Sequence, residues 1–195
     1  MTKEIADAAL IREYLAGKDK AFEKLYRKYE RPLYSFIYRF VGSKESAEDV
    51  FQQTWLKVIG ALENYEERGK FGSWLFGIAN NASLDLVRQK STNKRDDYAS
   101  EEMDHLPHEE MIPDESVIHK EQSDLLENGI ETLPWEQKQV VLLRVYAEMS
   151  FKEIAAMIDA PLNTVLGRMH YAVKNLRKII ETTYGEDPSH VLSKV

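Results

Sequence analysis

The second half of the chain carries residues with the types and spacing of a DNA-binding helix pair. Ser150 and Glu153 stand three positions apart before an apolar run, which is typical of a capping box at the start of a helix. Asp159 then predicts a tight turn, because Asp tolerates the left-handed conformation. A longer segment follows over about 162–183, and residues 163–180 hold four basic residues and no acidic one. This order predicts a helix-turn-helix.

The predicted second helix of this motif offers base-reading and phosphate-binding side chains on one face. Recognition helices read bases with N-terminal residues and hold phosphates with basic ones. The candidate DNA contacts are Asn163, Thr164, Gly167, Arg168, His170, Tyr171 and Lys174. Val165 and Ala172 are expected to face the core, with Leu166 packing at its rim. The alternative from the pattern alone is a helical hairpin whose basic face is only solvated.

A second group of candidates surrounds the start of the segment that follows Gly69. Aromatic side chains beside cations suit unstacked bases of a single strand, and amides can bond base edges. The residues of this group are Tyr65, Lys70, Phe71, Trp74, Asn80, Asn81 and Arg88. Phe71 and Trp74 also fit ordinary core positions, so core packing is the alternative interpretation.

Other chemistry finds little support in the sequence. The absence of cysteine excludes disulfides, thiolate metal sites and a cysteine nucleophile. A segment broken by prolines holds possible metal ligands, but it offers no scaffold to fix their geometry; these are His105, His108, Glu109, Glu110 and His119. The chain lacks a phosphate-binding glycine loop and a nucleophile elbow. We therefore expect no enzyme, no metal and no cofactor.

Charge and periodicity together define the elements that must position these candidates. The chain has 195 residues and a net charge of −7, but residues 1–95 carry +4, residues 96–124 carry −10 and residues 125–195 carry −1. Apolar residues recur at helical spacing before and after the acidic stretch, without strand-like alternation. The prediction is an all-α fold with two small helical domains, 1–95 and 118–195, joined by an acidic flexible linker, 96–117.

Individual helix boundaries follow from local signals. Pro32 interrupts a long apolar stripe, so a kink or a restart is expected there. Ser43 resembles an N-cap for the next helix, which is expected to bury Ile59 among other apolar residues. Further helices are expected over about 116–132 and from Pro134 to about Ala147.

The chain shows no export or membrane signal in its sequence. Apolar runs stay well short of the ~18 residues that a membrane span needs. The residues after Met1 lack the apolar core of a signal peptide. We expect a cytoplasmic protein without membrane contact of its own.

Three motifs in order give the sequence a family resemblance that covers nearly all of it. The chain resembles the extracytoplasmic-function (ECF, group IV) sigma factors of bacterial RNA polymerase. The segments that carry the resemblance are 21–26 (AFEKLY), 47–55 (AEDVFQQTW) with 71–82 (FGSWLFGIANNA), and Leu133-Pro134 with 150–155 (SFKEIA) and 163–165 (NTV).

The resemblance implies a non-catalytic sigma factor that binds core RNA polymerase, directs it to promoters and helps to melt them. It places Asp49, Gln52 and Gln53 on the polymerase contact. It implies −10 contacts by Lys70, Phe71, Ser73, Trp74, Asn80, Asn81, Ser83 and Arg88, and −35 contacts by the helix-turn-helix candidates. It also implies an anti-sigma partner and a linker that runs toward the polymerase active site. The linker's acidity fits a decoy for nucleic acid or a simple solvated spacer.

Some positions depart from the family pattern. Gln53 stands where many members carry Glu, and Gly77 stands where a basic residue is frequent. Leu166, Gly167 and Tyr171 occupy positions that are often Lys, Ser or Thr, and Arg. These changes predict fewer phosphate contacts and a different −35 preference. The alternative functions are a two-domain helix-turn-helix transcriptional regulator and a helical adaptor that binds only protein.

Overall fold

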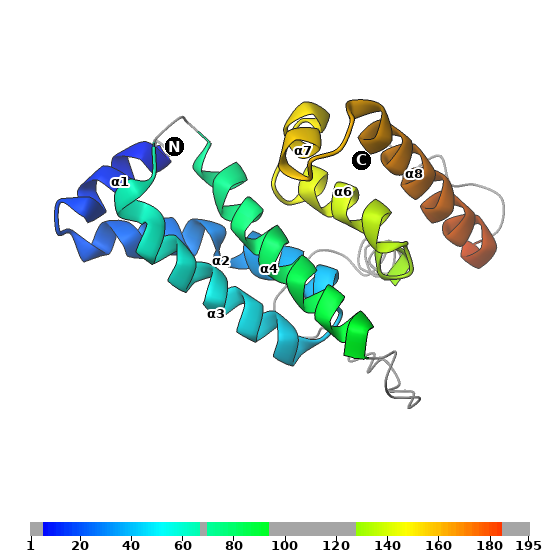
Figure 1. The fold of residues 1–195 in the computed structure, drawn as a ribbon, viewed down its shortest axis with the longest axis horizontal. Coiled ribbons are helices and arrows are strands. Elements are labelled where there is room, and N and C mark those ends of the chain that lie inside the picture. Colours follow the sequence, from blue (N-terminus) through cyan, green and yellow to red (C-terminus); the bar gives the residue numbers. More distant parts are fainter. Residues whose placement is uncertain (1–5, 67–69, 94–127, 185–195) are drawn as a thin grey trace. The chain divides into compact units, whose positions relative to one another are not determined.

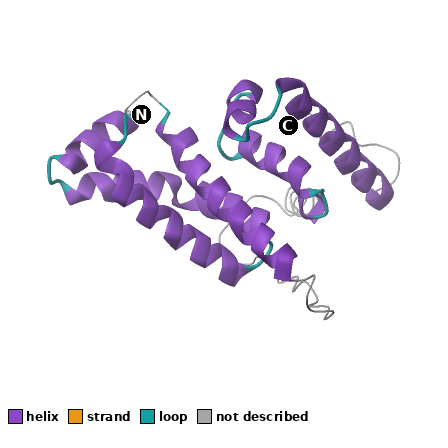
Figure 2. Cartoon of the chain, in the orientation of Figure 1, coloured by secondary structure: helices purple, strands orange, loops and turns teal. Residues whose placement is uncertain are grey.

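The computed structural model describes residues 6–66, 70–93 and 128–184. Within these ranges the regular structure is helical and contains no strand (Figure 2). The described residues form two compact units, one built from the helices before residue 94 and one from the helices after residue 128 (Figure 1). The all-helical, two-unit fold predicted from the sequence is confirmed. The predicted linker, 96–117, lies outside the described residues.

The first unit is a bundle around one long central helix. Its elements are α1 (Asp7–Leu15), α2 (Asp19–Val41), α3 (Lys44–Ala61), the short 3-10 helix η1 (Leu62–Asn64) and α4 (Phe71–Asn93). Helix α2 packs against α1, α3 and α4. It ends at Gly42, whose φ of 75° is the left-handed conformation that glycine adopts without strain.

The core of this unit comes from apolar residues that recur every three or four positions. Leu33, Phe36 and Ile37 of α2 are fully buried, as are Leu75 and Ala79 of α4. The rings of Phe36 and Phe76 meet edge to face, with centroids 5.3 Å apart. The helical stripe read from the sequence is therefore the surface that joins α2 to α4.

Helix α2 passes through Pro32 as one continuous helix, so the expected restart does not occur. A proline in a helix interior costs about 3 kcal/mol. Leu25 before Pro32 and Leu33, Phe36 and Ile37 after it are fully buried, and each such apolar side chain contributes about 1.5–3 kcal/mol. Packing on both sides of the proline thus outweighs its local cost. Ser43 does take the N-cap position of α3, but its side chain makes no capping hydrogen bond.

The second unit consists of short helices closed by one long helix. Residues 128–131 are helical, and α6 (Trp135–Val145), α7 (Phe151–Met157) and α8 (Leu162–Tyr184) follow. Helix α8 packs against both α6 and α7. The fully buried residues of this unit are aliphatic and include Leu142, Leu143, Ile154, Val165 and Ala172. Most of the helix expected over 116–132 lies outside the described residues.

The local signals read at the helix-turn-helix are present in the structure. The Ser150 hydroxyl accepts the Glu153 N–H at 3.3 Å, and the Glu153 carboxylate accepts the Ser150 N–H at 2.9 Å. These two bonds are the reciprocal bonds of a capping box. Asp159 has a φ of 49°, which is the left-handed conformation expected of the turn. Nothing among the described helices combines the length and the apolar character of a membrane span.

Candidate nucleic-acid and polymerase interfaces

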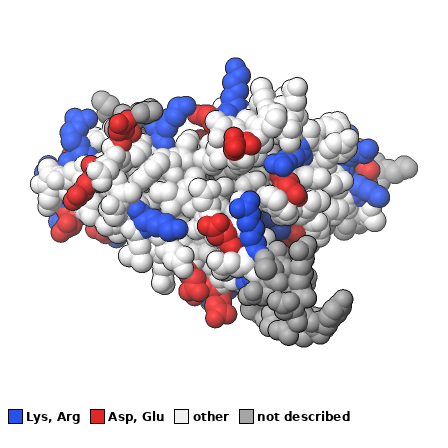
Figure 3. Space-filling view, in the orientation of Figure 1, with Lys and Arg blue, Asp and Glu red and all other residues white. Residues whose placement is uncertain are grey.

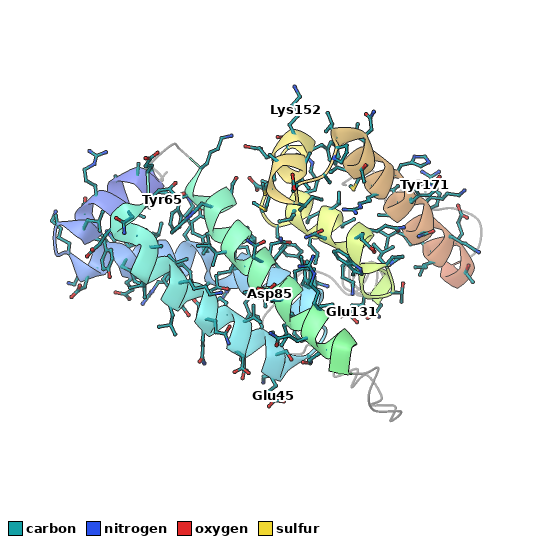
Figure 4. The ribbon with its side chains drawn as sticks, in the orientation of Figure 1. Glu45, Tyr65, Asp85, Glu131, Lys152 and Tyr171 are labelled. Atoms are coloured by element: carbon teal, nitrogen blue, oxygen red, sulfur yellow. The ribbon has the colours of Figure 1, made fainter. Side chains whose placement is uncertain are left out.

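Helix α8 presents a polar and basic face because its other face is fixed by packing. Val165, Ala172 and Leu176 are buried, as their spacing predicts. Tyr171 is 56% exposed and projects from the side of α8 away from α6 and α7 (Figure 4). The other predicted −35 residues divide by exposure: Asn163, Thr164, His170 and Lys174 are exposed, and Gly167 and Arg168 are half-buried. The structure therefore brings this candidate group to one face.

Two positions on this face differ from an ordinary solvated helix surface. Leu166 is 41% exposed and is not covered as a rim residue would be. A Cβ atom added at Gly167 would meet no atom within 4 Å, so the glycine leaves open space beside the helix backbone. A ligand can therefore approach the backbone closely between Leu166 and Tyr171.

A cluster of three rings stands at the start of α4. The ring centroids of Tyr65 and Trp74 are 4.6 Å apart, and Phe71 lies 5.7 Å from each of them. Phe71 is only 1% exposed, whereas Tyr65 and Trp74 are half-buried. Phe71 is thus the buried member of the cluster, whereas Tyr65 and Trp74 are partly exposed residues.

The remaining −10 candidates lie along α4 in two classes. One helical face carries four of them, because successive members stand four, seven and seven positions apart: Lys70, Trp74, Asn81 and Arg88. Lys70, Asn81 and Arg88 are exposed, and Ser73 is half-buried. Asn80 and Ser83 are buried, at 1% and 0% exposure. The structure therefore assembles Lys70, Ser73, Trp74, Asn81 and Arg88 into one stripe, and it does not expose Phe71, Asn80 and Ser83.

The outer face of α3 carries the three predicted polymerase contacts. Asp49, Gln52 and Gln53 are all exposed. Leu56, at the centre of the same face, is 69% exposed, and Ile59 on its flank is 41% exposed. The expectation that Ile59 is buried was wrong, because the core side of α3 is filled by residues a quarter-turn away, such as Val58. The sequence reasoning also missed Leu56, although its spacing of four from Gln52 was a usable signal.

Comparison with known proteins identifies both units. The family model for Sigma-70 region 2 matches residues 25–92, and the model for Sigma-70 region 4 matches residues 123–176. Together the two matches cover more than half of the chain. The chain belongs to the sigma-70 family of RNA polymerase sigma factors, in its ECF group.

Named relatives agree with this assignment, and one solved structure shares the fold. The ECF RNA polymerase sigma factor SigW of Bacillus subtilis is 27% identical over 177 residues, covering 86% of this chain and 93% of SigW. The ECF sigma factor SigE of Mycolicibacterium smegmatis is 30% identical over 157 residues, covering 80% of this chain and 60% of SigE. The Bartonella quintana sigma factor RpoE, solved with the anti-sigma factor NepR, has the same fold, with a TM-score of 0.69 at 18% identity; the match covers 84% of this chain and 99% of RpoE.

The two matched regions of this sigma factor contain the faces described above. The region 2 match includes the outer face of α3 and nearly all of α4, and the region 4 match includes α7, the turn and most of α8. Charged groups of both signs are interspersed over the surface in view, separated by uncharged areas (Figure 3). Among the described residues no cluster has the makings of a metal site, and the histidines considered as ligands lie outside them.

Burial changes the titration of three side chains. Burial raises the pKa of Tyr26, and the adjacent Glu30 raises it further. Burial also raises the pKa of Tyr34, with Glu48 and Tyr38 adding to the effect. In the second unit, burial lowers the pKa of Lys138, and Glu131 opposes that shift. None of the three is a candidate DNA contact, so these shifts bear on stability.

Proposed function

We propose that this alternative sigma factor, which directs RNA polymerase to start transcription, reads its promoter with two separate helical faces. The outer face of α8 contacts the −35 element, and the stripe along α4 contacts the −10 element. The observation that carries the proposal is the exposed α8 face, where base-reading and cationic side chains stand opposite a fully buried apolar stripe.

The −35 role divides between two kinds of side chain on α8. Asn163 is exposed in the first turn, where the amide can bond a base edge in the major groove. Lys174 and Lys178 are exposed farther along, at the spacing of one turn, and suit phosphates. Leu166 is exposed between Asn163 and Lys174 and offers an apolar contact.

The −10 role rests on the stripe of α4 and the rings at its start. Trp74 and Tyr65 offer aromatic surface on which an unpaired base can stack. Lys70 and Arg88 are exposed on the same side and suit the backbone phosphates of the strand. Asn81 is the exposed amide on this face, so it is the better candidate than the buried Asn80 for a base-edge contact.

The partners follow from the family and from the α3 face. Core RNA polymerase binds the sigma factor, and we assign Asp49, Gln52, Gln53 and the exposed Leu56 to that contact. The solved neighbour is held by an anti-sigma factor, and we propose a partner of the same class for this chain. The protein acts in the cytoplasm, without catalytic activity, cofactor or metal of its own.

Run-off transcription with purified core polymerase tests this function. We expect promoter-specific RNA only when core and the sigma factor are both present. Replacing Gln52 and Gln53 by Ala should weaken core binding, and Gln89→Ala, at an exposed position of α4 outside the stripe, should leave it unchanged. A helix-turn-helix regulator would instead bind DNA but would not allow core polymerase to start transcription by itself. An adaptor would bind no DNA.

A further inference from the structure

The first residue of α1 is bonded to the middle of α2. The Tyr29 hydroxyl donates to one carboxylate oxygen of Asp7 at 2.6 Å, and the Lys28 ammonium donates to the other at 2.8 Å. Asp7 opens α1, where the positive end of the helix dipole also favours a carboxylate. Asp7 is therefore held by two hydrogen bonds from residues more than 20 positions away in the sequence and by the dipole of its own helix.

The ring of Tyr29 connects this bond to the start of α4. It meets the Phe71 ring edge to face, with centroids 5.5 Å apart. A Cβ atom added at Gly72 would lie 3.2 Å from the Tyr29 hydroxyl oxygen and 3.4 Å from its ring. Such contacts are tight, so a side chain at this position would displace the ring by a few tenths of an ångström. The absence of a side chain at Gly72 is what lets Tyr29 sit against α4 and still reach Asp7.

Phe71 lies between Tyr29 and the two partly exposed rings of Tyr65 and Trp74, so its position links them. It is 1% exposed and lies 5.7 Å from both Tyr65 and Trp74. A ring packed this closely transmits displacement, because interiors have few voids to absorb it. The contacts thus run without a break from Asp7 through Tyr29 and Phe71 to the two rings proposed to stack on a base.

We infer that Asp7 and Tyr29 are positioning residues for the capture of an unpaired promoter base by Trp74 and Tyr65. The inference rests on the proposed −10 function of these rings. A stacking platform must be fixed to a fraction of an ångström by its supporting residues. The hydrogen bond to Asp7 fixes the Tyr29 ring, and that ring in turn supports Phe71. Gly72 leaves the space that the Tyr29 ring needs to make this contact. Neither Asp7 nor Tyr29 touches the DNA.

The test uses holoenzyme assembled from the full chain and core polymerase. Tyr29→Phe removes only the hydroxyl, and Gly72→Ala displaces the ring while the hydroxyl remains. Tyr14→Phe is the matched control, because the Tyr14 ring packs at a tilt against Phe22 in the same unit, with centroids 5.0 Å apart, and can keep that contact. The readouts are affinity for core, affinity for a −35 duplex, the melting temperature of the free chain, and affinity for a single-stranded −10 oligonucleotide.

We expect Tyr29→Phe to weaken binding of the −10 oligonucleotide by roughly three- to tenfold, the range of one lost hydrogen bond, and we expect Gly72→Ala to weaken it as well by displacing the ring. Core and −35 affinities should not change, and Tyr14→Phe should change nothing. Asp7→Asn keeps an oxygen that accepts from Tyr29, so it should restore most of the binding that Asp7→Ala loses. The double variant Asp7→Ala/Tyr29→Phe should be no worse than the more affected single variant.

Two results would overturn the inference, and they are separable from failure of the proposed function. Unchanged oligonucleotide binding in Tyr29→Phe, with a clear loss in Trp74→Ala, would remove the positioning role and leave the −10 role intact. An equal loss of core affinity and oligonucleotide binding, together with a lower melting temperature, would mean that the Asp7–Tyr29 bond only stabilises the packing of α1 on α2. If Trp74→Ala itself has no effect, the −10 function of the rings fails.

Discussion

The two units of this sigma factor are built from different side chains. In the first unit, aromatic rings meet along the seam between α2 and α3; the Tyr26 ring, for example, lies 4.9 Å from Trp55 and 6.1 Å from Phe51. Among the residues that the structure describes, the core of the second unit is mainly aliphatic. The contact between aromatic rings in this part of the second unit is that of His170 and Tyr171 on the surface, with centroids 5.5 Å apart. The difference matches the two proposed ligands. At the start of α4 the rings of Tyr65 and Trp74 suit unstacked bases, whereas the polar face of α8 suits the groove of a duplex.

The largest expected effect tests whether each unit depends on its own core. Phe36→Ala should lower the free energy of unfolding of the first unit by about 3–5 kcal/mol, because it leaves a cavity in a fully buried site. Leu142→Ala should lower that of the second unit by about 2–5 kcal/mol. Hydrogen exchange of peptides from α2 and α8 measures both. Equal loss of protection in both helices after either change would contradict two separate cores.

A single substitution, at Trp74, tests whether the rings of the first unit bind an unpaired base. Trp74→Ala should weaken holoenzyme binding to a single-stranded −10 oligonucleotide by about 1–3 kcal/mol, the usual contribution of one stacked base. Trp135 is 40% exposed at the start of α6 in the second unit, which makes Trp135→Ala the matched control. Equal losses in the two variants would argue against a base platform at the start of α4.

Two substitutions in α8 test how the second unit divides base reading and phosphate contact on the duplex. Asn163→Ala should relax discrimination at one or two base pairs of the −35 element, by about 1–3 kcal/mol. Lys174→Ala should weaken all sequences alike and reduce the salt slope by about one. Titration of a panel of −35 duplexes at several salt concentrations separates these effects. If only Lys174→Ala alters the sequence preference, the helix is rotated differently in the groove.

Two serines at N-cap positions give a smaller, well-matched contrast between the units. Ser150→Ala removes both side-chain bonds of the hydroxyl at the start of α7 and should cost the second unit about 1 kcal/mol. Ser43→Ala should cost the first unit less, because the Ser43 side chain makes no cap bond. Urea unfolding midpoints measure the two costs. A larger shift for Ser43→Ala would show that the Ser150 cap contributes little.

The smallest expected effect concerns alkaline pH, where the two units should respond with opposite sign. The raised pKa values of Tyr26 and Tyr34 mean that the folded first unit favours the neutral phenols. That stability is present below pH 10.0, the ordinary pKa, and is lost as pH rises through the higher folded values. Burial lowers the pKa of Lys138, so the second unit carries a cost at low pH that disappears as pH rises toward 10.5.

Urea unfolding from about pH 8 to about pH 11 measures these slopes. Replacing Tyr26 and Tyr34 by Phe should flatten the fall of the first unit, and Lys138→Met should flatten the rise of the second. Identical slopes in the parent chain and in both variants would mean that these groups do not govern the alkaline response.

The sequence by itself determined most of the helices of this protein and several of their exposed positions, but it gave no prediction for α1 or η1. Helical spacing predicted that Val165, Ala172 and Leu176 are buried and that Tyr171 is exposed, because a helix fixes the direction of every side chain relative to its neighbours. The Ser150 capping box and the Asp159 turn were equally legible, because their bonds and backbone angles are local. The polar residues of the exposed α3 face were predicted from the family resemblance, and helical spacing misplaced Ile59, which stands at the edge of the apolar stripe.

Only the tertiary structure decided what depends on contacts between distant segments. Pro32 continues a helix because packing on both sides outweighs its local cost, and no local rule contains that packing term. Asn80 and Ser83 are buried beside the exposed Asn81, a distinction that depends on what packs against α4. Asp7 and Tyr29 belong to no predicted site, and Gly72 lies in a family segment without a predicted role of its own, yet folding joins all three to the rings at the start of α4. Spacing along a chain encodes one helix face at a time, and the meeting of three helices is a property of the fold alone.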